Sequence, residues 1–291
     1  MGPWLGGPVD TPFSRVVRVD RAGSTNADLR AAALADPAAW PHGSVLVADH
    51  QDAGRGRSGR SWVTPPGTAL TASVLVRSRV RAQQLGWLPL LTGLAVQRGC
   101  AGLLPGVAPV SVRLKWPNDV LAVGAGETDV DGWGRDRKLA GILVEALPPR
   151  PGRDTGETTG ATHTADAVSA VVGIGVNVAQ EPADLPVPWA TSLRALGCDA
   201  GPAQVLSAVG GELFPLLERW EAADGDADAS ELRGDVSAAC VTLGAEVRTE
   251  LPAGPGPAGR AIGLDADGRL LVEQEDEVAA VAAGDVLRVR R

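Results

Sequence analysis

The segment "GRGRSGR" at residues 54–60 lies between two of the strongest predicted strands of the chain, "SVLVADHQ" at 44–51 and "TALTASVLVR" at 68–77. Both flanking segments are rich in apolar and β-branched residues, as strands are. Glycines let the backbone approach a ligand closely, and arginines offer forked donors that match carboxylate and phosphate oxygens. No Gly-Lys-Ser/Thr follows and no helix opens here, so neither a P-loop nor a dinucleotide-binding turn is indicated. The pattern predicts an anion-binding loop at a strand end. A plain Arg-Gly linker is disfavoured because a linker would not normally separate two strong strands.

The pattern of predicted strands and helices along the chain indicates a central α/β domain at 1–240 and a small C-terminal β domain at 241–291. Further strands are expected at 15–20, on both sides of Pro117 within 110–123, and at 138–147 and 166–179. Helical patterns occupy 23–35, 83–104, 203–223 and 229–240. After Leu243 the chain consists of short apolar runs separated by turns, and "DADGR" at 265–269 is a hairpin signal.

Composition limits the possible functions. The net charge is −8 and the pI is near 5.0, which argues against a general nucleic-acid-binding surface. Cys100, Cys198 and Cys240 are far apart and form no Cys-x-x-Cys motif, as suits buried thiols in a reducing cytosol. No secretory signal is visible, and the longest apolar stretch contains Pro89 and indicates a core helix. We therefore expect a cytoplasmic protein with no nucleic-acid and no membrane partner.

Lysine is rare in this chain. Lys115 and Lys138 are the two lysines among 27 Lys and Arg residues. Lysine is a compact point charge on a flexible stem, whereas arginine is a planar fork, so the two are not interchangeable. A chain that uses arginine almost everywhere is expected to keep lysine where function requires it.

Other polar and aromatic groups carry weaker signals. "GSTN" at 23–26 is most simply a helix N-cap, and the glycines of "GIGVN" at 173–177 fit a ligand role or close packing about equally. Trp116 is expected in the core. His42, His50 and His163 show no metal-ligand spacing, and no Ser-His-Asp arrangement is visible.

Taken in order, "STN", "GRGRSGR", "KWPND", "KLAGILVE" and "GIGVN" closely resemble the biotin–protein ligase family, over roughly residues 15–291. The resemblance implies an α+β fold, with a catalytic domain related to class II aminoacyl-tRNA synthetases, built on a seven-stranded mixed sheet, and a small C-terminal SH3-like β-barrel. It implies ATP-dependent ligation of biotin to one lysine of a biotin carboxyl carrier protein through biotinyl-5′-AMP. The carrier expected is a biotin domain of an acyl-CoA carboxylase, and the ligase is expected to be a monomer or weak homodimer.

The resemblance also implies roles for individual residues. The catalytic group comprises Lys138, Arg55, Arg57 and Asp119. Biotin would be bound by Ser24, Thr25, Asn26, Gln51, Arg55, Gly56, Arg57 and Lys138. ATP and the adenylate would be bound by Arg57, Arg60, Lys115, Asn118, Asn177 and Trp189.

Two further points follow from the implied chemistry. Mg²⁺ is implied by the triphosphate, with no firm protein ligand. The carrier amine has a reference pKa of about 10.4, so Asp119 would either accept its proton or orient it, and both roles stay open.

The sequence departs from the family in two respects. "STN" begins at Ser24, which leaves no room for the helix-turn-helix of the bifunctional members, so a ligase without repressor activity is expected. The segments 124–137 and 148–166 are long for the family and have no assigned role; the first is expected to be an exposed hairpin loop and the second mobile.

Three alternatives are weighed against the ligase. A lipoate or octanoate ligase or transferase of the same fold lacks GRGRSGR followed by KWPND. A DNA-binding biotin sensor conflicts with the acidic pI and the absent helix-turn-helix. A non-catalytic biotin-binding or carrier-docking module would not need the residues of the ATP site.

Overall fold

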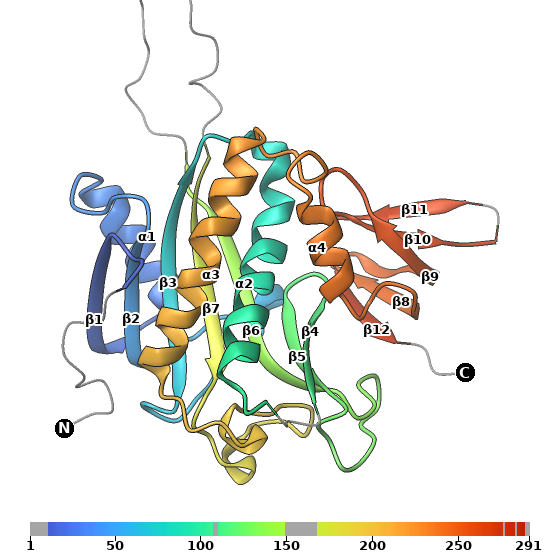
Figure 1. Cartoon of the computed structure of the whole chain (residues 1–291), viewed down its shortest axis with the longest axis horizontal. Coiled ribbons are helices and arrows are strands. Elements are labelled where there is room, and N and C mark those ends of the chain that lie inside the picture. The colour runs from blue at the N-terminus through green and yellow to red at the C-terminus, as the bar shows by residue number, and fades with distance from the viewer. Residues whose placement is uncertain (1–10, 107–109, 149–167, 276, 283, 289–291) are drawn as a thin grey trace, which may run out of the picture.

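A seven-stranded mixed sheet forms the centre of the molecule in the computed structural model, which describes residues 11–106, 110–148, 168–275, 277–282 and 284–288. Its strands run in the order β1-β2-β3-β7-β6-β5-β4 (Figure 1). The first pair is parallel and the other neighbours are antiparallel. Strand bounds are β1 Arg15–Ala22, β2 Ser44–Gln51, β3 Ala69–Ser78, β4 Ser111–Lys115, β5 Asp119–Val123, β6 Arg137–Ala146 and β7 Val168–Asn177. The expected seven-stranded mixed sheet is therefore confirmed, whereas the expected mobility of 148–166 concerns residues that, except Pro148, lie outside the described part.

Helices cover both faces of this sheet because alternate strand residues point to opposite sides. Val45 and Val47 of β2 belong to the large core under α2 and α3, while Leu46 between them packs with Leu29 of α1 on the other face. Figure 1 shows α2 and α3 side by side along the sheet. The helices are α1 Thr25–Ala35, α2 Trp87–Leu103, α3 Pro202–Ala222 and α4 Leu232–Ala239, with short 3₁₀ turns at Arg57–Gly59, Ala82–Gly86, Pro182–Asp184 and Arg194–Leu196.

The C-terminal strands form a second, antiparallel sheet in the order β11-β10-β9-β8-β12. Their bounds are β8 Glu246–Leu251, β9 Gly254–Leu264, β10 Leu270–Glu273, β11 Val278–Val281 and β12 Asp285–Arg288. The predicted hairpin at 265–269 is confirmed, and Gly268 takes a positive φ of 76° in its turn. Trp87 and Trp116 donate their indole N–H to main-chain oxygens of this turn, at 2.7 Å and 3.0 Å. The turn thus docks the second sheet onto the first, and Trp116 is buried in the core as expected. The boundary near residue 240 remains a prediction.

The cysteines are buried, as the sequence predicted, and all three are unpaired. Burial raises the pKa of the Cys100 thiol to about 12, which makes this group unreactive. In the described part of the chain, no helix combines the length and hydropathy that crossing a bilayer requires.

Candidate active site

One cavity of about 500 Å³ contains every residue that the sequence predicted for the site. It lies between the start of α1, the 54–60 loop, the strands β6 and β7, and the segment around Trp189. The predicted residues that line it are Ser24, Thr25, Asn26, Gln51, Arg55, Gly56, Arg57, Arg60, Lys115, Asn118, Asp119, Lys138, Asn177 and Trp189. Side chains from distant parts of the chain therefore converge as the motifs predicted, although their roles are not decided by position alone.

One end of the cavity is a largely buried hydrogen-bond network at the start of α1, which is neutral except for the carboxylate of Glu145. The backbone N–H and the hydroxyl of Thr25 both donate to Oε1 of Gln51, at 2.8 Å and 3.0 Å. Ser73 donates to Oδ1 of Asn26 at 2.6 Å, and Nδ2 of Asn26 donates to Oε2 of Glu145 at 2.7 Å. Ser73 and Asn26 are both buried, so the strength of each bond depends on the other remaining in place.

The N-cap expected at "GSTN" forms in a different way. Ser24 occupies the N-cap position with an extended backbone, but its side chain makes no capping hydrogen bond. Gln51, from the end of β2, accepts the N–H of Thr25 instead. The buried hydroxyl of Ser24 lines the cavity.

The glycines of β7 allow two side chains to lie against the sheet. A Cβ at Gly173 would come within 2.5 Å of Oδ1 of Asn26, and a Cβ at Gly175 would come within 2.6 Å of the Trp62 ring. Either methyl group would push into the cavity. Close packing therefore explains these glycines, and direct ligand contact by them remains a prediction.

The 54–60 loop folds into a small hairpin above the sheet. Gly56 N–H donates to the carbonyl of Arg60 at 2.7 Å, and Trp62 N–H donates to the carbonyl of Gly54 at 2.9 Å. A Cβ at Gly54 would lie 2.3 Å from the Trp62 carbonyl oxygen, so only glycine fits at this crossing. Ser58 has a φ of 54°, a left-handed conformation that is strained for a residue other than glycine.

The three arginines of the loop point to three different partners. Arg57 is partly buried and donates to Oδ1 of Asn118 at 3.1 Å. Burial lowers the pKa of Arg57, and the carboxylates of Asp285 and Asp119 oppose that shift. Arg55 lies 3.8 Å from Glu145, and Arg60 forms an ion pair with Asp285 of β12.

Lys138 and Asp119 form the central ion pair of the site. Nζ of Lys138 lies 2.6 Å from Oδ1 of Asp119, and the two residues belong to the adjacent strands β6 and β5. Burial alone would raise the pKa of Asp119, but Lys138, and after it Lys115, outweigh burial and hold that pKa below its ordinary 3.8. Asp119 is therefore an anion at neutral pH and a weak proton acceptor in this arrangement.

Two asparagines of the predicted nucleotide site also brace the backbone. Asn118 donates through Nδ2 to the carbonyl of Ile142 and accepts the Ile142 N–H on its own carbonyl, each at 2.9 Å. Asn177 is buried and donates to the carbonyl of Thr191 at 2.9 Å. Both side chains therefore fix the wall of the cavity.

The segment 124–137 differs from the exposed hairpin loop that the sequence predicted. Asp136 and Arg137 are 8% and 6% exposed, because the Arg137 guanidinium sits inside the loop and donates to the carbonyls of Thr128 and Gly134 at 2.6 Å and 2.9 Å. The expectation is therefore wrong for these two residues. Trp133 from the same segment lines the cavity.

Sequence reasoning missed three residues that line the cavity, Trp62, Trp133 and Asp285. It also missed Ser73 and Glu145, which hydrogen-bond to Asn26. Trp62 directly follows the glycine-arginine loop, and Glu145 ends the "KLAGILVE" motif, so these two could have been found from their place in the motifs. The indole N–H of Trp62 is buried and has no hydrogen-bond partner among the residues that the structure describes. A polar atom of this kind beside a cavity is available to a bound ligand.

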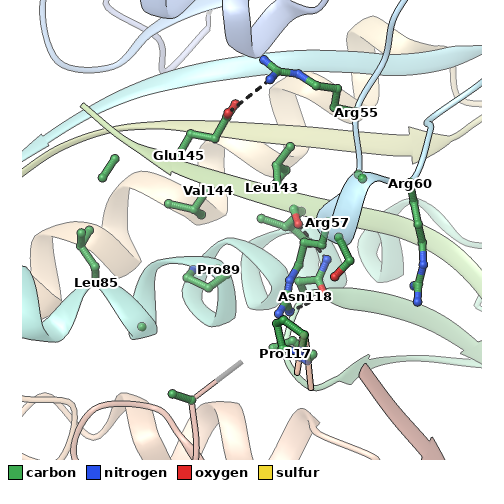
Figure 2. Close-up of a pocket in the computed structure, with 18 of the residues that line it drawn as sticks. Arg55, Arg57, Arg60, Leu85, Pro89, Pro117, Asn118, Leu143, Val144 and Glu145 are labelled. Atoms are coloured by element: carbon green, nitrogen blue, oxygen red, sulfur yellow. Dashed lines mark hydrogen bonds and ion pairs between the residues drawn. The ribbon is translucent and has the colours of Figure 1, made fainter. Parts of the chain in front are cut away.

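A second groove of about 970 Å³ also lies against the loop (Figure 2). It shares Arg55, Arg57 and Asn118 with the first cavity. Figure 2 shows Leu85 and Pro89 along its floor, with Arg55 joined to Glu145 above them. The two hollows therefore meet at the loop and at Asn118.

No group of three or more His, Cys, Asp or Glu side chains in the described ranges is arranged to hold a metal ion.

Two family models match the chain, and together they define its class. The biotin/lipoate A/B protein ligase family matches residues 21–153, and the biotin protein ligase C-terminal domain matches residues 242–289. The chain belongs to the biotin protein ligase family.

Individual relatives agree with this assignment. The chain is 38% identical to a biotin--[acetyl-CoA-carboxylase] ligase of Mycobacterium tuberculosis, over 94% of this chain and 88% of the relative. It is 34% identical to the Paracoccus denitrificans ligase of the same name, over 69% and 71% of the two chains. The solved structure of the Aquifex aeolicus biotin protein ligase in complex with biotin and ATP superposes with a TM-score of 0.69 at 26% identity, covering 95% of this chain and all of that one. The prediction of a biotin–protein ligase is therefore confirmed.

Proposed function

We propose that this chain joins biotin to a lysine of a biotin carboxyl carrier domain in two ATP-dependent steps within the 500 Å³ cavity. Biotin carboxylate attacks the α-phosphate of ATP, giving biotinyl-5′-AMP and pyrophosphate. The carrier amine then attacks the acyl carbon and releases AMP. The observation that carries this proposal is the position of Lys138, which joins a neutral hydrogen-bonding end of the cavity to a cationic end.

The neutral end suits the head group of biotin. Thr25, Asn26, Gln51 and the nearby Ser24 offer donors and acceptors that are held in place by one another. A site of this kind rejects analogues that lack the matching polar group, because the buried protein groups would lose their partners. The valeryl chain would then run toward Lys138 under Trp62, whose ring lies 5.8 Å from Nζ.

The cationic end suits the nucleotide. The first step brings two anions together, so it needs fixed positive charge where negative charge develops. Lys138, Arg55 and Arg57 line the cavity at this point, and Asn118 orients Arg57. Arg60 would exchange Asp285 for the triphosphate, Lys115 and Asn177 would flank the nucleotide, and Trp189 would stack on adenine. Mg²⁺ would be held by the ATP phosphates.

In the second step Asp119 would position the incoming amine. Its lowered pKa makes it a weak base, so an electrostatic role toward an ammonium is favoured over proton abstraction. The carrier would approach through the 970 Å³ groove, which shares Arg55, Arg57 and Asn118 with the cavity.

Strand β6 offers a further element for docking the carrier. It pairs with β5 through Gly141 but with β7 as far as Ala146. Beyond Ile142, whose main-chain groups bond to Asn118, its outer edge could receive an extended segment of a partner.

We also propose a fold type, domain bounds, a cellular location and an oligomeric state for the enzyme. The seven-stranded sheet would be of the class II aminoacyl-tRNA synthetase type and would form the domain 1–240. The C-terminal sheet would be an SH3-like barrel formed by 241–291, and the enzyme would act in the cytoplasm as a monomer or weak homodimer.

The test is transfer of labelled biotin to a biotin carboxyl carrier domain with Mg-ATP, together with pyrophosphate release. Transfer that requires ATP is expected. Pyrophosphate release without transfer would limit the chain to adenylate synthesis. Transfer of lipoate or octanoate in place of biotin would move it to the other branch of the matched family and overturn the proposal.

A further inference from the structure

Trp133 lies beside the expected adenine site, in the segment 124–137 that is long for the family. Its ring is stacked on that of Trp189, with centroids 6.1 Å apart and an interplanar angle of 11°. Both residues line the cavity and both are partly exposed. The pair therefore places two nearly parallel aromatic rings at the wall of the cavity.

The segment that carries Trp133 is held in shape by its own hydrogen bonds. Gly126 N–H donates to the carbonyl of Arg135, and Val130 and Gly134 exchange two main-chain bonds of 2.8 Å and 2.7 Å. The Arg137 guanidinium fills the interior so closely that a Cβ at Gly126 would come within 2.2 Å of it. A side chain on such a braced turn is pre-organised, which lowers the entropy lost when it binds a ligand.

Trp133 also contacts one of the two lysines of the chain. Nζ of Lys115 lies 4.0 Å from the centroid of the Trp133 ring, within the range of a cation–π interaction. The indole therefore places an aromatic ring, which can stack on a base, beside a positive charge, which can attract phosphates.

We propose that Trp133 is a second base-stacking residue, and that Trp133 and Trp189 together bind the purine of the nucleotide. The inference rests on the proposed function in that the nucleotide is ATP. Purine rings stack on aromatic side chains with useful energy. Parallel orientation and partial exposure are what such a platform requires, whereas two tryptophans that served only the core would be buried.

The experiment compares Trp133→Ala with Trp133→Phe and with Asp131→Ala, an exposed position of the same segment. Calorimetry measures binding of ATP, of inorganic tripolyphosphate and of biotin, each alone. Trp133→Ala should weaken ATP binding about tenfold or more while binding tripolyphosphate and biotin as the native protein does. Trp133→Phe should recover most of the loss, and Asp131→Ala should bind like the native protein.

Three outcomes of these binding measurements would overturn the proposal that Trp133 stacks on the base. Unchanged ATP binding by Trp133→Ala would overturn it. Equal weakening toward ATP and tripolyphosphate would assign the effect to Lys115 and would also overturn base stacking. A loss of biotin binding or of thermal stability in Trp133→Phe as well would make the residue structural. Because ATP binding is measured without turnover, a native protein that binds ATP but transfers no biotin would refute the proposed function and leave this inference standing.

Discussion

The two ends of the cavity differ in the kinds of side chain that form them and in how those side chains are held. At the start of α1, Thr25, Asn26, Gln51 and Ser73 form short neutral hydrogen bonds among themselves, and three of the four are buried. At the other end, arginines and tryptophans from loops and lysines from the strands β4 and β6 are partly or fully exposed, and several are paired with carboxylates or rings. The first end is complete before a ligand arrives, whereas the second is held by partners that phosphate could replace.

This difference has a physical reason. An uncharged, polar ligand is distinguished by geometry, so its site benefits from rigidity and from groups that are costly to leave unpaired. A polyanion is bound by charge, and charges on mobile side chains stay hydrated and available. We take Lys138 as the junction of the two ends, since its ammonium pairs with Asp119 at 2.6 Å and lies 5.8 Å from the centroid of the Trp62 ring.

The largest effect is expected at this junction. Lys138→Arg keeps the charge but replaces a compact ammonium, 2.6 Å from Asp119, with a longer planar fork that places its charge elsewhere in the cavity. We expect adenylate formation to fall by about a hundredfold or more, measured as biotin-dependent pyrophosphate release. Arg79→Lys, an exchange at an exposed position, is the control. Full activity of Lys138→Arg would mean that charge alone suffices at the junction.

The next effect tests the neutral end. Asn26→Ala removes the amide that bonds to Ser73 and to Glu145, while Ser73 keeps its bond to Thr25 and Glu145 keeps Arg55 nearby, so the free energy of unfolding should fall by about 1–3 kcal/mol. Biotin affinity should fall about tenfold or more while ATP affinity stays constant. Urea titration and calorimetry measure these quantities, and Arg30→Ala on the exposed face of α1 is the control. An equal loss of ATP affinity in Asn26→Ala would show that the two ends of the cavity do not bind separate ligands.

A smaller effect is expected at the cationic end. The Arg60–Asp285 pair is 63% and 25% exposed, so solvent screens it. A double-mutant cycle of Arg60→Ala and Asp285→Ala should give a coupling energy below about 1 kcal/mol in the free energy of unfolding. The coupling should shrink further with added salt. A coupling energy well above about 1 kcal/mol would show that the cationic end, like the neutral end, is firmly held without a ligand.

The smallest effect is expected from pH near neutrality. Asp119 has a lowered pKa in the folded protein, so its contribution to stability is fully present above the ordinary value of 3.8 and is lost as pH falls through the lower folded value. The stability difference between native protein and Asp119→Asn should thus be constant between about pH 6 and 8. It should shrink only in acid. A difference that changed near neutrality would show that Asp119 titrates there and could act as a base.

The sequence was most informative where a motif or a bias marks single residues. Lys138, the 54–60 loop and the strand pattern were all visible, because glycine, arginine and alternating β-branched residues act locally. Ser73 was not visible, since strand alternation shows which face a residue occupies but not what it meets there. Asp285 reaches the cavity only after the second sheet docks. The turn that buries Arg137 and presents Trp133 depends on tertiary packing, and its polar sequence suggested exposure.

The main chain of Lys138 has a role of its own. Its N–H donates to the carbonyl of Trp189 at 2.6 Å, and its carbonyl accepts the N–H of Thr191 at 2.9 Å. The segment carrying the tryptophan and the strand carrying the ammonium are therefore mechanically joined at one residue. Side-chain exchanges at 138 leave this joint intact. Under the proposed function, the main chain of Lys138 therefore fixes the position of the base-stacking segment relative to the ammonium that serves the chemistry.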